Sequence, residues 1–202
     1  MNEATIFQSK YDSTFTDALK EFVSKHGVNV FQGGQAWVID RGSYVWRVWF
    51  KDPGYERFLK YLESTPDSPH LPKILSKLRE EPVQFSGMPN GMSIRYLKLE
   101  KLSPMSNGPF KDSVNALSFC NIRASEVPED IVELLSKAKL FNDTGFGRTI
   151  TPKDFRDQVL RNSKFFTLVL DLMRNHKAND IADENIMQRN GVPVITDPFA
   201  FS

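Results

Sequence analysis

The sequence lacks the features of a disulfide-bonded or membrane-spanning protein. A single cysteine, Cys120, stands among 202 residues, so no internal disulfide can form, which favours a reducing compartment. No apolar run approaches the ~18 residues of a membrane span, and residues 1–10 lack the apolar segment of a cleaved signal. We therefore expect a soluble protein of the cytoplasm.

An excess of charge of either sign is also missing. The 26 basic and 25 acidic residues leave a formal charge of +1, which predicts neither nucleic acid nor a membrane as a partner. Histidine is scarce, and the isolated His26 and His70 indicate no zinc site. The chain has no repeat, and its 40% apolar residues can form the core of one domain or of one two-lobed unit.

The first half of the chain is patterned mainly as β-strands. An amphipathic helix is expected over 13–25, and a second one, with Pro53 near its first turn, over 54–64. β-branched and aromatic runs separated by turn residues predict the strands. We expect strands at 28–31, 36–39, 44–50, 74–78, 84–85 and 92–97, of which the first three form an antiparallel meander.

A Ser/Pro/Asn/Gly-rich segment at 103–109 is the best domain boundary, between an N-lobe (1–102) and a C-lobe (103–202). The C-lobe is mainly helical, with helices expected at 127–138 and 152–175. Thr151 is the expected cap of the second helix, since Pro152 suits a first turn. Asn190-Gly191 then predicts a type I′ hairpin.

Three oxygen-bearing side chains surround this hairpin in the sequence. Asp180 can accept a hydroxyl proton, Asn185 follows five residues later, and Asp197 stands beyond the hairpin. An Asp five residues before an Asn often occurs by chance, as a solvated loop or a helix cap. The hairpin places Asn185 and Asp197 at neighbouring strand ends, and these are the donors that magnesium and a nucleoside triphosphate require. The pattern predicts a phosphotransfer site.

The order of these elements, with Asp-x-x-x-x-Asn, a hairpin and a second Asp, resembles the protein kinase-like superfamily. Glu184-Asn185-Ile186-Met187 and Ile195-Thr196-Asp197-Pro198 are most similar to the early protein kinases of short-tailed, T-odd coliphages. Minimal kinase effectors injected by bacteria are a second relative. The resemblance implies an α+β, two-lobed fold, with a β-rich N-lobe that carries one helix and a reduced, mainly helical C-lobe.

The resemblance also implies roles for individual residues. Asp180 would be the catalytic base, and Asn185 with Asp197 would bind Mg²⁺. The residues that would contact ATP come from the predicted N-lobe. They are the glycine turn, a cation on the third strand, the acid on the following helix that pairs with this cation, and the backbone at the end of the lobe, which would contact adenine. They are Gly33, Gly34, Gln35, Arg47, Glu56, Glu100 and Leu102.

The chain departs from the family pattern at several positions. Arg47 stands where the family has a phosphate-binding Lys, and a guanidinium differs from an ammonium in size and geometry. Lys51 could assist from the same strand face, and Glu63 is the alternative to Glu56 as the helix partner. Pro198 follows the metal-binding Asp and fixes its own φ, which predicts that this segment does not flip.

The sequence thus predicts an ATP- and Mg²⁺-dependent Ser/Thr protein kinase of minimal size that acts on a host or partner protein. Two alternatives remain open. A small-molecule phosphotransferase would share the Asp180, Asn185 and Asp197 arrangement, and a catalytically weak nucleotide-binding module would be consistent with Arg47. The sequence given ends soon after Asp197, without an activation segment, so we expect substrate to dock by another surface.

Overall fold

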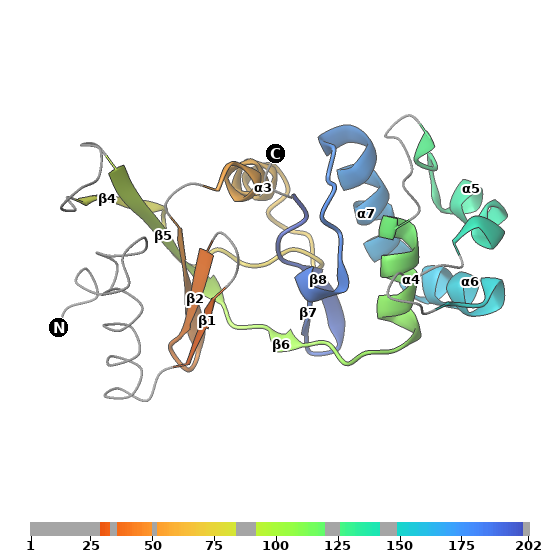
Figure 1. The fold of residues 1–202 in the computed structure, drawn as a ribbon, viewed down its shortest axis with the longest axis horizontal. Coiled ribbons are helices and arrows are strands. Elements are labelled where there is room, and N and C mark those ends of the chain that lie inside the picture. Colours follow the sequence, from red (N-terminus) through yellow and green to blue (C-terminus); the bar gives the residue numbers. More distant parts are fainter. Residues whose placement is uncertain are drawn as a thin grey trace. The chain divides into compact units, whose positions relative to one another are not determined.

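The structure is a computed structural model in which the chain forms two compact units (Figure 1). The first unit comprises Met1–Asp52 and Lys73–Lys101, and the second comprises Pro53–Pro72 and Leu102–Ser202. The residues that the structure describes are 29–32, 36–49, 52–83, 92–119, 126–141 and 149–199.

The first unit contains a five-stranded antiparallel sheet. Its strand order is β1-β2-β3-β5-β4, and each neighbouring pair is antiparallel. β-branched and aromatic residues dominate the central strands, as expected for a pleated surface with one buried face. The strands are β1 (Val30–Gln32), β2 (Ala36–Asp40), β3 (Tyr44–Trp49), β4 (Arg79–Val83) and β5 (Met92–Glu100).

The core of this sheet is built from aromatic and aliphatic side chains on β2, β3 and β5. Trp37 pairs with Val48, which in turn pairs with Tyr96, and all three side chains are buried. Trp49, at the end of β3, has no exposed surface. The turn from β2 to β3 contains Gly42 with φ +82°, a conformation that glycine adopts without strain. The predicted three-strand meander is confirmed.

One strand of the first unit was predicted at the wrong residues. Residues 74–78, expected as a strand, form a single bridge from Ile74 to Leu99. The strand is instead β4, which the sequence conceals because Arg79, Glu80 and Glu81 have little β preference. Pro82 is tolerated there because β4 is an edge strand. Two predicted features, helix 13–25 and strand 84–85, lie outside the described residues.

The second unit begins with helix α3 (Pro53–Ser64), which the sequence predicted. Proline opens the helix, where its missing N–H is no loss. Its buried stripe includes Tyr55, Phe58 and Leu62, spaced by three and four residues. This helix was assigned to the predicted N-lobe, whereas the structure groups it with the second unit. The other boundary, between Lys101 and Leu102, lies within one residue of the predicted one.

In the described part of this unit, four further α-helices and two 3-10 helices, η2 and η3 (Asp183–Asn185), follow. Phe165 and Phe166 of the last helix contact Phe110, and Phe155 stacks on Phe141, so phenylalanines form the core. The helices are α4 (Pro109–Phe119), α5 (Ile131–Ser136), η2 (Ala138–Leu140), α6 (Pro152–Arg161) and α7 (Ser163–His176).

The helix prediction is correct in class and incomplete in its boundaries. The expected helix 152–175 is two helices, because the chain leaves helical geometry at Asn162, which has φ −117°. The predicted cap is confirmed, since Thr151 Oγ1 accepts a hydrogen bond from the Asp154 N–H at 3.1 Å. Helix α4 was missed, because it starts at Pro109, the last residue of the Ser/Pro/Asn/Gly-rich segment that predicted a boundary. The expected helix 127–138 shortens to α5.

A three-stranded sheet, in the order β6-β7-β8, completes the second unit. Its strands are β6 (Ser103–Pro104), β7 (Ile186–Arg189) and β8 (Val192–Ile195). Asn190 and Gly191 have φ values of +51° and +82°, which confirms the predicted type I′ hairpin. The α+β class is therefore confirmed. In the described part of the chain, no helix combines the length and apolarity needed to cross a lipid bilayer.

Candidate functional site

The loop that carries Asp180 is fixed where it leaves helix α7. Lys177 adopts the left-handed conformation with φ +55°, and the Ala178 N–H donates to the Leu172 carbonyl at 2.9 Å, which ends the helix. Ala178 and Ile181 are buried on either side of the loop. Asp180 lies between these two anchors and is half-buried.

Hydrogen bonds join this loop to both ends of the β7–β8 hairpin. The Asn185 Nδ2 donates to the carbonyl of Asp180 at 2.9 Å, and the Asp180 N–H donates to the carbonyl of Pro198 at 3.1 Å. The Asn185 carbonyl accepts from the N–H of Thr196 at 2.9 Å and from its Oγ1 at 3.0 Å. Thr196 and Pro198 flank Asp197, so the structure brings the predicted trio into one site.

The oxygens that this arrangement leaves available suit a divalent cation and a hydroxyl. The Asp180 carboxylate forms no hydrogen bond or ion pair with any residue that the structure describes, and neither does Asn185 Oδ1. One carboxylate oxygen of Asp197, Oδ1, is buried. A carboxylate and an amide oxygen fit Mg²⁺, which takes few protein ligands and keeps sites for water and phosphate. Among the described residues, no group of three or more His, Cys, Asp or Glu side chains is arranged so that it could hold a metal ion.

A short segment after α3 supports the hairpin from the side of β8. The Ile195 N–H donates to the His70 carbonyl at 3.0 Å, and the His70 ring bonds the Pro193 carbonyl through Nδ1 at 2.9 Å. The Arg189 guanidinium donates to the carbonyls of Pro69 and Leu71 at 2.9 and 2.8 Å. This support is local to the unit and fixes the strand end that precedes Asp197.

The residues after Asp197 are anchored to helix α3. Pro198 and Phe199 are buried. The Phe199 ring lies 6.2 Å from the Phe58 ring, and the Arg57 guanidinium lies over it at 4.7 Å. These contacts hold the segment beyond Asp197 in place. The absence of a flip at Pro198 stays a prediction.

In the first unit, Arg47 is engaged by an acid that the sequence interpretation did not consider. Its Nη2 lies 3.1 Å from Asp52 Oδ2, and the two side chains are only 12% and 5% exposed. The sequence contained one indication of this pair, because Asp52 stands five residues after Arg47. Glu56, the predicted partner, lies on α3 in the second unit and is half-buried, whereas Glu63 is exposed. The pairing of Arg47 with Glu56 stays a prediction.

The remaining predicted residues are placed only in part. Gly33, Gly34 and Gln35 lie outside the described residues, as does Lys51. Glu100 is the last residue of β5, and both its N–H and its Oε1 bond the backbone of Lys73, at 3.1 and 2.7 Å. Leu102 opens the second unit and is half-buried.

Two classes of contact at the site could not be read from spacing. Thr196 secures Asn185 through its hydroxyl, and Phe199 secures the segment after Asp197 through α3. Both residues stand next to predicted site residues in the sequence, yet their roles depend on tertiary pairing. In the sequence, the one available signal was the hydroxyl of Thr196 next to Asp197.

Comparisons with known proteins add little to this geometry. No family model matches the chain, and no curated protein matches it. Among solved structures, a protein described as "Putative fructosamine-3-kinase", from Haemophilus somnus 129PT, is 13% identical to the chain. The match covers 89% of this chain and 70% of that one, with a TM-score of 0.31. A similarity at this level carries no argument, so the functional proposal relies on the site.

Proposed function

We propose that the chain is an ATP-dependent phosphotransferase of protein kinase-like fold that transfers the γ-phosphate to a hydroxyl group. One observation supports the proposal above all others: hydrogen bonds of 2.9 to 3.1 Å gather Asp180, Asn185 and the residues flanking Asp197 into one site. Within it, the Asp180 carboxylate has no partner among the described residues. An unoccupied acceptor on a fixed backbone is what orienting a hydroxyl requires.

Each residue of this site has a distinct role in the proposal. Asp180 accepts the proton of the attacking hydroxyl and orients its oxygen toward the phosphate. Asn185 Oδ1 and Asp197 would hold Mg²⁺, which, when bound, neutralises charge on the phosphates. Thr196 keeps the Asn185 backbone in register with the strand end beside Asp197. Catalysis then depends mainly on positioning and on charge neutralisation.

For the nucleotide, the proposal uses the residues that the family resemblance implied. Arg47 supplies the cation for the α- and β-phosphates, with Glu56 as its orienting partner. Gly33, Gly34 and Gln35 cover the phosphates, and the backbone of Glu100 and Leu102 meets adenine. The Arg47 side chain is largely buried on β3, so its guanidinium is restricted in the directions it can take.

We propose a Ser or Thr hydroxyl of a host protein in the cytoplasm as the acceptor. This choice follows the resemblance of residues 184–187 and 195–198 to phage early kinases. A small-molecule hydroxyl is the competing acceptor, because the same three side chains would serve it equally well.

A second candidate function follows from the first unit. The Arg47–Asp52 ion pair at 3.1 Å occupies the guanidinium that the phosphates would need. Because both partners are largely buried, exchanging Asp52 for phosphate requires a change at this pair. A nucleotide-binding module with weak or no transfer activity is the function that this observation favours.

One experiment separates these candidates. The purified protein is incubated with γ-labelled ATP and Mg²⁺, alone, with host lysate, and with a panel of aminoglycosides and sugars, beside an Asp197→Ala control. Label in lysate proteins that is absent with Asp197→Ala and with EDTA supports the protein kinase, and label in the panel supports the small-molecule enzyme. Thermal stabilisation by ATP without transfer to any acceptor supports the binding module. The absence of both phosphate transfer and thermal stabilisation would contradict all three candidate functions.

A further inference from the structure

Asp171, in the penultimate turn of α7, receives hydrogen bonds from two elements of the second unit. The Tyr61 hydroxyl of α3 donates to Asp171 Oδ2 at 3.0 Å, and the Asn175 Nδ2 donates to Asp171 Oδ1 at 2.8 Å. The His176 Nε2 lies 3.8 Å from the same Oδ2. We call these four residues the Asp171 cluster. It joins the last turn of α3 to the last turn of α7.

The chemistry of the Asp171 cluster suits a persistent contact. Tyr61 is 7% exposed, and burial, together with its hydrogen bond to Asp171, raises the pKa of its hydroxyl well above the usual range. The hydroxyl therefore stays protonated and donates to a carboxylate, which is a charge-assisted bond. The His176 ring meets the Tyr61 ring edge-on at 4.7 Å between centroids, which closes the cluster on its third side.

We propose that Asp171 is a positioning residue of the phosphotransfer site, which holds helix α3 against the end of α7. The proposal rests on the proposed function. Helix α3 carries Glu56, and its Phe58 contacts Phe199, two residues after Asp197. The end of α7 leads through three residues to Asp180. One carboxylate thus joins α7, which leads into the loop of Asp180, to α3, against which the segment after Asp197 packs.

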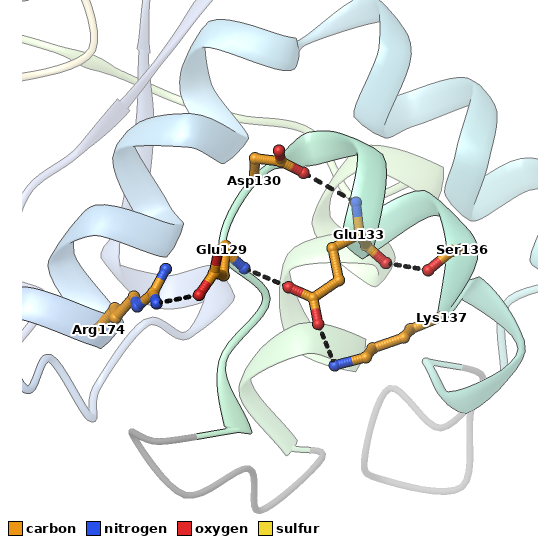
Figure 2. A network of polar contacts seen from close by, with 6 residues as sticks. All are labelled: Glu129, Asp130, Glu133, Ser136, Lys137 and Arg174. Carbon is orange, nitrogen blue, oxygen red and sulfur yellow. Dashed lines mark hydrogen bonds and ion pairs between the residues drawn. The ribbon is translucent and has the colours of Figure 1, made fainter.

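The last turn of α7 offers a matched control, Arg174, whose partner lies outside α3. Arg174 Nη2 lies 2.7 Å from Glu129 Oε1, just before α5 (Figure 2). Glu133 of α5 accepts from the Glu129 N–H and pairs with Lys137, an ammonium that lowers the pKa of the Glu133 carboxyl. No predicted site residue lies on α5. Breaking the Arg174–Glu129 pair therefore disturbs α7 and spares the connection to α3.

The test compares Tyr61→Phe, Asp171→Asn, the double variant and the control Arg174→Gln. Tyr61→Phe deletes one hydroxyl and keeps the ring, and Asp171→Asn keeps the side-chain size. Hydrogen exchange of the α3 amides, kcat, the KM for ATP and Tm are measured on the full chain. We expect α3 exchange to rise roughly tenfold in both single variants, while exchange in α6 stays at the wild-type rate.

We expect kcat to fall about tenfold in each single variant, and no further in the double variant, because the two side chains act through one bond. Arg174→Gln should lower Tm as much as Tyr61→Phe does and keep kcat within about twofold. A structural role alone would lower Tm in all variants and leave kcat unchanged.

The outcomes distinguish this proposal from the proposed function. Unchanged α3 exchange in both single variants would overturn the Asp171 cluster as a restraint. Faster α3 exchange with unchanged kcat would overturn the positioning role and leave the phosphotransferase intact. A wild-type protein that transfers no phosphate would overturn the proposed function together with the catalytic part of this proposal, and the exchange data would still decide whether Asp171 holds α3.

Discussion

The two units of the chain treat their predicted site residues in opposite ways. In the second unit, backbone bonds fix Asp180 and Asn185 while the Asp180 carboxylate and Asn185 Oδ1 bond no described residue. In the first unit, the Arg47 guanidinium is bonded to Asp52 and largely buried. The comparison teaches that the oxygens proposed for a metal and a hydroxyl are held without a partner among the described residues, whereas the guanidinium proposed for phosphate is already bonded within its own unit.

The largest effect is expected on the rate of phosphate transfer when Asp180 is substituted. Asp180→Asn should lower the rate of phosphate transfer by roughly 10³-fold, because the amide cannot accept the hydroxyl proton. The free energy of unfolding should change by less than about 0.5 kcal/mol, because the carboxylate bonds no residue of the described chain. Single-turnover kinetics and thermal unfolding measure the two quantities. Transfer at the wild-type rate would remove Asp180 from the mechanism.

In the first unit, substitution of Asp52 is expected to lower the free energy of unfolding strongly, unlike substitution of Asp180. Asp52→Ala should lower the free energy of unfolding by about 3 kcal/mol, because it removes the carboxylate that neutralises a largely buried guanidinium. Chemical denaturation of the full chain measures the loss. As a control, Arg47→Met combined with Asp52→Leu should lose far less than the two single changes together, since no charge is left uncompensated. A small loss in Asp52→Ala would show that the pair is weak and that Arg47 is available to phosphate.

The sequence was most informative where a feature is local. The Asn190-Gly191 turn, the Thr151 cap and the start of α3 at Pro53 were each predicted, because turn geometry and capping depend on neighbouring residues. The same locality explains why Asn185 and Asp197 could be assigned to one end of the hairpin from the sequence. A two-residue hairpin fixes the register of its strands, so Asn185 lies opposite Thr196 and accepts its hydrogen bond, and Asp197 is the next residue.

The sequence was least informative where a pairing is distant. Strand β4 is charged and contains Pro82, so only its place at the edge of the sheet, beside β5, makes it a strand. Asp171 is bonded by a tyrosine 110 positions earlier, which no local pattern reveals. The break between α6 and α7 at Asn162 was hidden because apolar spacing continues through it. In each case tertiary contacts decided the outcome.

A smaller effect in the second unit is expected at Asn185, the amide proposed to bind Mg²⁺. Asn185→Ala should lower activity at limiting Mg²⁺ roughly tenfold or more, with partial recovery at high Mg²⁺, because one ligand oxygen is lost. It should also cost about 1 kcal/mol of stability, since its bond to the Asp180 carbonyl at 2.9 Å disappears. Asn162→Ala is the control, because its Nδ2 bonds the Gln158 carbonyl at 3.1 Å in the same unit. Both variants should lose similar stability, and only Asn185→Ala should change the Mg²⁺ dependence.

The smallest effect is expected from replacing one turn glycine in each unit, which allows a direct comparison of the two units. Gly191 in the β7–β8 hairpin and Gly42 in the β2–β3 turn both have φ +82°, and an added Cβ at either would meet no atom within 4 Å. Alanine should therefore cost about 1–2 kcal/mol at both positions, entirely from the left-handed backbone. Gly191→Ala strains the hairpin that spaces Asn185 from Asp197, so the Mg²⁺ concentration for half-maximal activity should rise several-fold. Gly42→Ala should leave it unchanged, and an equal rise in both variants would mean that overall stability, and not hairpin geometry, governs metal binding.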